Sequence, residues 1–246
     1  MAFVLDTTRE SLIAQPRRQV IASAGARFRD LCAKRLAGEP IAYLLGEREF
    51  FGRSFRVDRS VLIPRPETEC LVEAALQALK GLDSPSVLDL GTGSGCIAIT
   101  LALERPDADV SATDASEPSL ELARSNAAAL GARVAFVHAD WYVPKGRRFD
   151  LVVSNPPYVA ADDPHLAELG YESREAMTDG SDGLACLRQI IDQAPAHLSS
   201  RGALLVEHGY DQGAAVRAMM IESGFGSVRT LTDLAGVERV CYARLG

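Results

Sequence analysis

The sequence predicts an α/β protein in which a doubly wound, mostly parallel sheet follows a small helical N-terminal unit and a β-hairpin. From about Pro64 onward, apolar runs of strand length alternate with segments of helical periodicity, the pattern of a parallel sheet covered on both faces. A glycine-rich turn at residues 91–95 also joins one of these strands to the next helix. The 246 residues, 47% of them hydrophobic, can bury one full core and a small appendage.

The N-terminal part is expected to be helical. Apolar side chains between residues 9 and 36 recur at helical spacing with interruptions at Pro16 and Gly25, so we expect two or three short helices. A connection rich in glycine and proline follows at residues 38–46. The alternating, partly aromatic stretch at residues 49–63 resembles a β-hairpin.

Seven strands and five helices are expected in the larger unit. The predicted strands cover residues 86–90, 109–113, 133–137, 149–154, 203–207, 227–232 and 237–243. The predicted helices cover residues 67–80, 95–104, 118–130, 184–197 and 212–223. Residues 233–236 join the last two strands closely, which fits a sheet whose final strand is an antiparallel insertion.

Composition argues against several classes of protein. The formal net charge of -7 and the pI near 5.2 argue against a protein that holds nucleic acid mainly through phosphate contacts. The five cysteines are scattered and form no CxxC pair, which predicts reduced thiols and no zinc or other metal site. The first residues lack a signal-peptide pattern, and no apolar run approaches the ~18 residues of a membrane span, so we expect a cytoplasmic protein without a membrane partner.

A ligand site is predicted where the first buried strand of the larger unit ends. The turn after this strand consists of Gly91, Thr92, Gly93, Ser94 and Gly95. Without Cβ atoms, the glycines let the chain turn tightly and bring its backbone against a ligand. Dinucleotide-binding folds use such turns too, but Cys96 occupies the sixth position of their GxGxxG pattern here.

Acidic residues after the next two strands complete this predicted site. Asp114 follows the glycines by about twenty residues, where a carboxylate can accept hydrogen bonds from both ribose hydroxyls of a nucleoside. The alternative is that Asp114 or Ser116 caps the following helix. Asp140 can bind an adenine amine while Trp141 packs on the ring, although a lone tryptophan is often simple core. These features in this order resemble the class I methyltransferase fold, in which they hold S-adenosyl-L-methionine.

The most specific motif follows the fourth predicted strand and consists of Asn155, Pro156, Pro157 and Tyr158. Such a loop offers a fixed side-chain amide and backbone carbonyls that no helix consumes. A conjugated NH2 group is a poor nucleophile, but Asn155 Oδ1 and the Pro156 carbonyl can accept its two hydrogens, aim the nitrogen at the methyl donor and stabilise the developing charge. Tyr158 is expected to close over the planar acceptor. No general base is expected, because the nitrogen can lose its proton after the methyl group has been transferred.

Further motifs are spread over most of the chain. They lie at residues 38–46, 49–52, 62–69, 180–184, 207–209 and 233–239. Together with the glycine turn and the Asn-Pro-Pro-Tyr loop, they resemble the release factor glutamine methyltransferases, the PrmC/HemK family. The resemblance implies methylation of the glutamine in the Gly-Gly-Gln motif of bacterial class 1 peptide chain release factors, with S-adenosyl-L-homocysteine as the other product. It implies a protein partner and no direct contact with nucleic acid, and we expect a monomer.

The resemblance also implies a division of the chain. A substrate-docking domain is expected at residues 1–46, a hairpin hinge at 47–66, and the cofactor-binding domain at 67–246. Residues 64–69 could be only a rigid link that starts a helix. Because they lie next to the cofactor strand, we expect them to border the active site and Arg65 to contact the substrate. The first domain is shorter than usual in the family, so we expect that its first helix is missing or that its start site is misassigned. Either would alter the affinity for the partner. Ser173 stands where relatives usually have proline, so we expect a mobile lid at residues 160–180.

Three other functions fit parts of the pattern. A nucleic-acid adenine or cytosine amino-methyltransferase carries the same Asn-Pro-Pro-Tyr loop and predicts salt-sensitive binding to DNA or RNA. A nucleotide-binding regulatory module that has lost its chemistry would have no use for an intact Asn155 and Asp114. A nicotinamide-dependent oxidoreductase would share the glycine turn but has no use for the Asn-Pro-Pro-Tyr loop.

Overall fold

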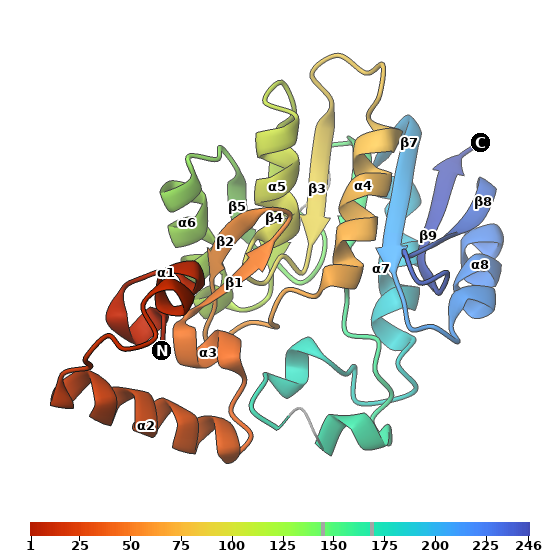
Figure 1. The fold of residues 1–246 in the computed structure, drawn as a ribbon. Helices are drawn as coiled ribbons and strands as arrows, with labels where there is room; N and C mark the ends of the chain where they lie inside the picture. The colour runs from red at the N-terminus through yellow and green to blue at the C-terminus, as the bar shows by residue number, and fades with distance from the viewer. Residues whose placement is uncertain (144–145, 168–169) are drawn as a thin grey trace.

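The computed structural model describes residues 1–143, 146–167 and 170–246, and Figure 1 shows a twisted sheet with helices packed around it. Within the described residues, seven strands form one sheet in the order β5-β4-β3-β6-β7-β9-β8. Their bounds are β3 Ser86–Leu90, β4 Asp109–Asp114, β5 Ala135–His138, β6 Phe149–Ser154, β7 Leu198–Glu207, β8 Phe225–Thr232 and β9 Glu238–Leu245. Neighbouring strands are parallel except at β9, which lies antiparallel between β7 and β8. The predicted antiparallel insertion of the last strand is confirmed.

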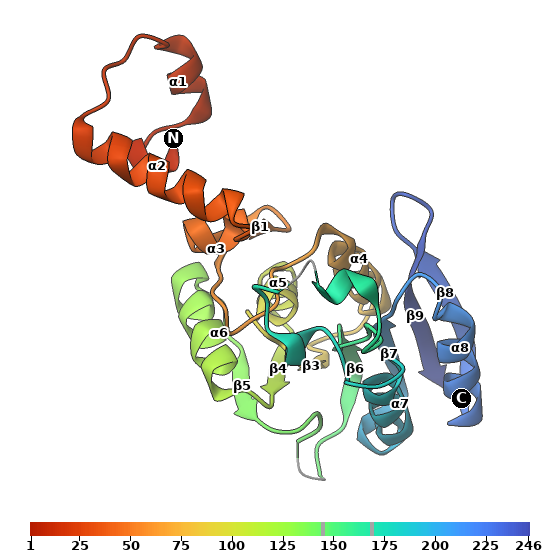
Figure 2. The ribbon, with the colours of Figure 1, turned by 90° about the horizontal axis from the view of Figure 1, so that it is seen from below.

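Two layers of helices cover the sheet, on opposite sides in Figure 2. One layer contains α4 (Glu69–Ala78), α5 (Cys96–Glu104) and α6 (Glu117–Leu130), and the other contains α7 (Ala185–His197) and α8 (Gly213–Glu222). In β3, Val87 packs in the first core whereas Leu88 and Leu90 pack in the second, and all three are fully buried. Parallel strands between two helix layers need apolar residues on both faces, which explains the continuous hydrophobic runs.

The predicted elements of this unit are confirmed with shifts at their ends. Strand β7 begins at Leu198 rather than at residue 203, because its first residues already pair with Phe149 in β6 before a bulge. Helix α4 is preceded by a 3-10 turn, η2 (Pro66–Thr68), in which proline occupies the first position, where no backbone donor is needed. None of the helices in the described parts of the chain is long and apolar enough to span a membrane.

Two details of the N-terminal prediction were wrong. This unit contains η1 (Phe3–Leu5), α1 (Arg9–Ala14), α2 (Ala22–Leu36) and α3 (Ile41–Leu45). Gly25 lies inside α2 instead of ending a helix, since one glycine costs only about 1 kcal/mol relative to alanine. The supposed connection holds α3, which follows Pro40 and ends at Gly46 in the left-handed conformation, with φ of 76°.

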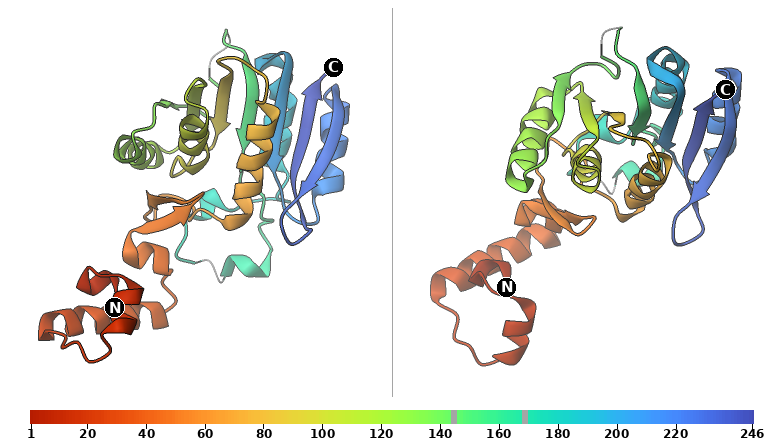
Figure 3. Two further views of the ribbon diagram at one scale, coloured as in Figure 1. Left: turned by 45° about the horizontal axis from the view of Figure 1, so that its top comes forward. Right: turned by 90° about the horizontal axis from the view of Figure 1, so that it is seen from above.

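The predicted hairpin forms from β1 (Glu47–Phe50) and β2 (Arg53–Arg56), and it ends before residue 63. Phe50 and Phe55 are at most 1% exposed and pack edge to face in the core beneath α4 and α5. In the helices before the hairpin, all of whose residues are described, Ala42 is the only buried residue. Figure 3 shows α1 and α2 projecting away from the main body. The hairpin is therefore anchored in the main core. The division at residues 46 and 66 stays a prediction.

Candidate functional site

The carboxyl ends of β3 and β6 lie side by side, because the two strands pair in parallel. The chain continues from β3 to β4 and β5 on one side, whereas β6 begins the other half of the sheet, so the topological switch point lies between β3 and β6. Figure 2 views the molecule from this edge. A cavity of about 500 Å³ opens there. It is lined by the predicted site residues Arg65, Gly91, Thr92, Gly93, Ser94, Asp114, Asp140, Trp141, Asn155 and Pro157.

Three predicted site residues, all within the described part of the chain, do not line this cavity: Gly95, Pro156 and Tyr158. Gly95 serves packing, since a Cβ there would lie 2.8 Å from Ile99 Cδ1. Pro156 is a buried residue of the loop, and Tyr158 is half-buried and packs beside the second core. The assignment of these three residues to the site stays a prediction.

A buried carboxylate, Asp89 of β3, holds the glycine turn in place. Its Oδ2 accepts a hydrogen bond from the Thr92 hydroxyl at 2.6 Å and another from the Ala98 amide at 3.2 Å. Burial raises the pKa of Asp89 to about 7, although both hydrogen bonds act in the opposite direction. Asp89 therefore links the end of β3, the glycine turn and the first turn of α5 into one rigid unit.

Asp114, at the end of β4, is fixed by two backbone amides. Its Oδ2 accepts from Gly93 N at 2.8 Å and its Oδ1 from Ser116 N at 2.9 Å. The cap of α6 is Ser116, whose hydroxyl accepts from Ser119 N, so the alternative of Asp114 as the cap is wrong. A carboxylate can accept about four hydrogen bonds, so Asp114 keeps capacity for ligand hydroxyls at the cavity. Burial raises its pKa, while these hydrogen bonds lower it.

Asp140 and Trp141 form the wall of the cavity beyond β5. Trp141 has a φ of +62°, uncommon outside glycine, and its carbonyl accepts the Thr113 hydroxyl at 2.6 Å. The indole lies against Gly91, where a Cβ would be 3.2 Å from Cζ3 of the ring. It also packs beside the second core, so the tryptophan contributes both to the core and to the cavity.

Asn155 follows β6, and the NH2 group of its side-chain amide is already hydrogen-bonded. Its Nδ2 donates to Thr68 Oγ1 at 3.1 Å. Among the described residues, no hydrogen bond is made to its Oδ1, nor to the carbonyl oxygen of Pro156. The preceding Ser154 donates its hydroxyl to the Leu90 carbonyl at 2.8 Å and ties the end of β6 to β3. The amide oxygen of Asn155 therefore stays available as an acceptor at the cavity.

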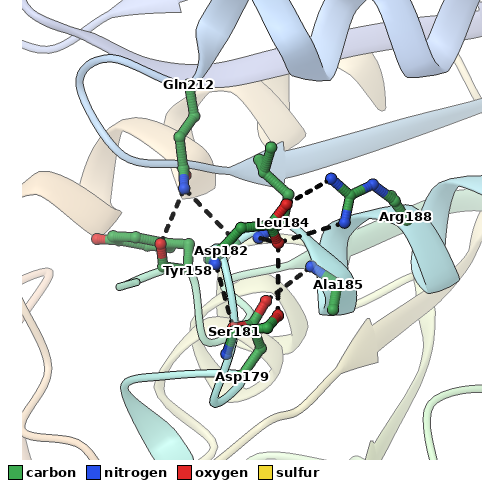
Figure 4. A network of polar contacts seen from close by, with 9 residues as sticks. Tyr158, Asp179, Ser181, Asp182, Leu184, Ala185, Arg188 and Gln212 are labelled. Atoms are coloured by element: carbon green, nitrogen blue, oxygen red, sulfur yellow. Dashed lines mark hydrogen bonds and ion pairs between the residues drawn. The ribbon is translucent and has the colours of Figure 1, made fainter. Parts of the chain in front are cut away.

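The loop after Asn155 is clamped from a distant segment, as Figure 4 shows. Gln212 Nε2 donates to the carbonyls of Tyr158 at 2.9 Å and Gly183 at 3.2 Å. Asp179 organises the segment around Gly183 by accepting from the backbone amides of Gly183 at 3.1 Å and Ala185 at 2.7 Å. The motif at residues 180–184 thus supports the Asn-Pro-Pro-Tyr loop from outside the cavity.

Gly183→Ala is expected to destabilise the protein more than Gly180→Ala. Both glycines are left-handed, with φ of 77° and 76°, but a Cβ on Gly183 would lie 2.3 Å from the Tyr158 carbonyl oxygen, whereas one on Gly180 meets nothing within 4 Å. We expect a loss of roughly 2–5 kcal/mol at Gly183, against about 1–2 kcal/mol at Gly180. Chemical denaturation of both variants measures this difference, and equal losses would contradict the close approach.

Arg65 lines the cavity and is held by a buried partner. Its Nη2 donates to Glu172 Oε1 at 2.5 Å, and Glu172 Oε2 accepts from the Ile63 amide at 3.1 Å. Tyr171 adds a hydrogen bond from its hydroxyl to the Ala37 carbonyl at 3.0 Å. Residues 168–169 of the predicted lid lie outside the described residues, and the mobility of the lid stays a prediction. Its described part is tied to the segment before α4 and to the end of α2.

The sequence assigned no role to Thr68, Glu172 or Glu207. Glu172 holds Arg65, and Thr68 holds Asn155. Glu207 Oε1 accepts the Tyr158 hydroxyl at 3.1 Å. Thr68 and Glu207 fall within motifs at residues 62–69 and 207–209, but a motif does not show which side chains meet.

Comparison with known proteins confirms the fold. The model of the methyltransferase small domain matches residues 68–172, and the model of the PrmC N-terminal domain matches residues 1–46. A solved methyltransferase from Pyrococcus furiosus is similar with a TM-score of 0.59 and 19% identity, covering 88% of this chain and 98% of that chain. The T. thermophilus 16S rRNA N2 G1207 methyltransferase, solved with AdoMet and guanosine, is similar with a TM-score of 0.60 and 21% identity, covering 81% of this chain and 50% of that chain. At these identities the likeness shows the class I methyltransferase fold alone.

Curated relatives are much more similar in sequence. The release factor glutamine methyltransferase of Neisseria gonorrhoeae is 51% identical over 249 residues, which is 99% of this chain and 90% of the relative. That of Burkholderia pseudomallei is 51% identical over 255 residues, which is 100% of this chain and 90% of the relative. The resemblance found in the motifs is confirmed, and the chain belongs to the release factor glutamine methyltransferase family.

Proposed function

We propose that this chain transfers a methyl group from S-adenosyl-L-methionine to the side-chain amide nitrogen of the glutamine in the Gly-Gly-Gln motif of bacterial class 1 peptide chain release factors. The names of its relatives support the reaction and the substrate. The observation that carries the proposal is the amide of Asn155. Its nitrogen is held by Thr68, and its oxygen is available where the cavity meets the end of β6.

The cavity residues fit the proposed methyl donor. Asp114 has acceptor capacity for ribose hydroxyls, the glycine turn brings backbone to the cavity surface, and the indole of Trp141 offers an aromatic face beside Asp140. A volume of about 500 Å³ lies within the range of small-molecule sites. When bound, S-adenosyl-L-methionine supplies a methyl group made electrophilic by its sulfonium.

The chain's own residues position and polarise the acceptor. Asn155 Oδ1 and the Pro156 carbonyl accept the two hydrogens of the glutamine NH2, which directs the nitrogen lone pair toward the donor side of the cavity. The same two oxygens stabilise positive charge as it develops on the nitrogen. The methylated nitrogen is then strongly acidic and loses its proton to water, so the proposal needs no general base. Pro157 and Arg65 border the acceptor from the cavity wall.

The proposal includes a docking role for residues 1–46 and a monomeric, cytoplasmic enzyme. Three apolar side chains on or beside α1 and α2 are well exposed: Ile13 at 70%, Ile21 at 71% and Leu36 at 89%. A helical unit that projects from the main body and exposes such residues has the character of a protein-binding surface. The hairpin at 47–66 would then link substrate docking to the cofactor-binding domain at 67–246.

A transfer assay with two classes of acceptor tests the proposal. The protein is incubated with methyl-labelled S-adenosyl-L-methionine and either a purified class 1 release factor or DNA and RNA, at low and high salt. We expect label in the release factor alone. Salt-sensitive labelling of nucleic acid with none in the release factor would favour the adenine or cytosine amino-methyltransferase instead.

A further inference from the structure

Four side chains at the Asn-Pro-Pro-Tyr loop and the segments packed on it form two hydrogen-bonded pairs. Asn155 Nδ2 donates to Thr68 Oγ1 at 3.1 Å, and the Tyr158 hydroxyl donates to Glu207 Oε1 at 3.1 Å. Thr68 and Glu207 are only 2% and 1% exposed. They come from different elements, the end of η2 and the end of β7. Thr68 also lines the cavity beside Asn155, whereas Glu207 is not among the residues that line it.

The two pairs lie close enough for the Thr68 hydroxyl to act on the Glu207 carboxylate. This hydroxyl interacts with the Glu207 carboxylate and lowers the pKa of that group, although in the described part of the molecule no group reaches Glu207 Oε2 at hydrogen-bond distance. A hydroxyl has one proton to donate. When that proton is directed to an ionised carboxylate, Thr68 Oγ1 presents only lone pairs to Asn155.

This arrangement selects one orientation of the Asn155 amide. An acceptor at Thr68 Oγ1 is satisfied by the NH2 end of the amide and not by its oxygen. The flipped amide would place Asn155 Oδ1 against Thr68 Oγ1 at a buried position. It would also turn the NH2 group of Asn155 toward the NH2 group of the substrate, so that two hydrogen-bond donors would face each other. Leaving such buried groups unpaired is costly, so the ionised carboxylate keeps Oδ1 of Asn155 at the cavity.

We propose that Thr68 and Glu207 are positioning residues for methyl transfer, which fix the Asn155 amide with its oxygen toward the acceptor NH2. The proposal rests on the proposed function of the site and deepens it. It predicts that the orientation depends on Glu207 being a pure hydrogen-bond acceptor. A protonated Glu207 can donate to Thr68, reverse the hydroxyl and admit the flipped amide.

The surroundings of Glu207 place its titration in an accessible range. Burial and the nearby carboxylate of Glu67 raise its pKa to about 7, against the hydrogen bonds of Thr68 and Tyr158 and the charge of Arg239. The thiols of Cys70 and Cys96 also face this charge, which contributes to their raised pKa values. The carboxyl is therefore ionised above about pH 7 and protonated below it. We expect kcat at saturating substrates to fall as pH drops through about 7.

Three threonine variants isolate the hydroxyl. Thr68→Val keeps the shape but removes the link, and we expect kcat at saturating cofactor to fall roughly 10- to 100-fold. Thr68→Ser restores the hydroxyl and should recover most of the rate. Thr100→Val is the matched control, since Thr100 in α5 is also fully buried but its hydroxyl has no hydrogen-bond partner among the described side chains. It should behave as wild type.

The pH profile separates positioning from a general loss of structure. Glu207→Gln cannot titrate, so its kcat should be reduced at all pH values and lose the step near pH 7. Thr68→Val should lose the step as well, whereas Thr68→Ser should keep it. A step that persists in Glu207→Gln would overturn the proposal and assign the titration to another group, such as Asp89, whose pKa is also raised to about 7 by burial.

The assay distinguishes this inference from the proposed function beneath it. All variants are compared with the wild type on the same release factor. A wild type that leaves the factor unmethylated would refute the proposed function, and the inference with it. An active wild type together with an equally active Thr68→Val would overturn the inference alone.

Discussion

Asn155→Ala is expected to abolish methyl transfer while the protein still binds S-adenosyl-L-methionine. The variant removes the amide oxygen that accepts a hydrogen from the acceptor NH2 and stabilises charge on its nitrogen. Loss of one such preorganised group typically costs about 10²–10³ in rate, and misplacement of the acceptor adds to this loss. Single-turnover transfer to a release factor measures the rate, and titration calorimetry measures cofactor affinity.

Asn155→Gln serves as the companion variant for this prediction. It keeps the amide but moves it by one methylene away from Thr68, so transfer should remain strongly impaired if position matters as much as chemistry. Cofactor binding that collapses in Asn155→Ala, with transfer preserved once cofactor saturates, would show that the assigned role is wrong.

Asp114→Ala is expected to weaken the binding of S-adenosyl-L-methionine as its main effect. Asp114 holds the Gly93 amide at 2.8 Å and keeps capacity for the ribose hydroxyls. Hydrogen bonds to a charged group contribute about 1.5–3 kcal/mol, which corresponds to roughly 10- to 150-fold in Kd. Calorimetry with the cofactor and with S-adenosyl-L-homocysteine should show the loss in both, because they share the ribose.

Asp109→Ala provides the matched control for Asp114→Ala. Asp109 starts the same strand, β4, and pairs with Arg147 at 2.5 Å in an exposed ion pair that stabilises little. The change removes the same charge at the opposite end of the strand, away from the cavity. Equal losses of cofactor affinity in both variants would point to a general electrostatic effect and contradict the ribose assignment.

The sequence predicted the sheet well because its strands are governed by local patterns. Val87, Leu88 and Leu90 form a continuous apolar run that only a strand covered on both faces can bury, and the glycines after it mark the turn. The Asn-Pro-Pro-Tyr loop was placed correctly for the same reason, since it directly follows such a run. The N-terminal helices were predicted less well, because most of their residues are exposed and their periodicity is weak.

Contacts between distant segments could not be predicted in this way. Glu172 reaches Ile63 and Arg65 across 109 and 107 residues of sequence. Thr68 reaches Asn155 across 87 residues. Such pairs depend on how loops fold over the sheet edge, and neither hydrophobic periodicity nor turn chemistry encodes them. The residues that we propose to bind the ligands could therefore be taken from motifs, whereas the contacts that hold them in place required the structure.

Peptide mass spectrometry tests most directly whether the site methylates a glutamine amide. A class 1 release factor is incubated with the protein and S-adenosyl-L-methionine, and the peptide that carries its Gly-Gly-Gln motif is fragmented. We expect a single methyl group on the glutamine side chain, absent when Asn155→Ala replaces the wild type. An unmodified glutamine, from a protein shown by calorimetry to bind the cofactor, would contradict the proposed function.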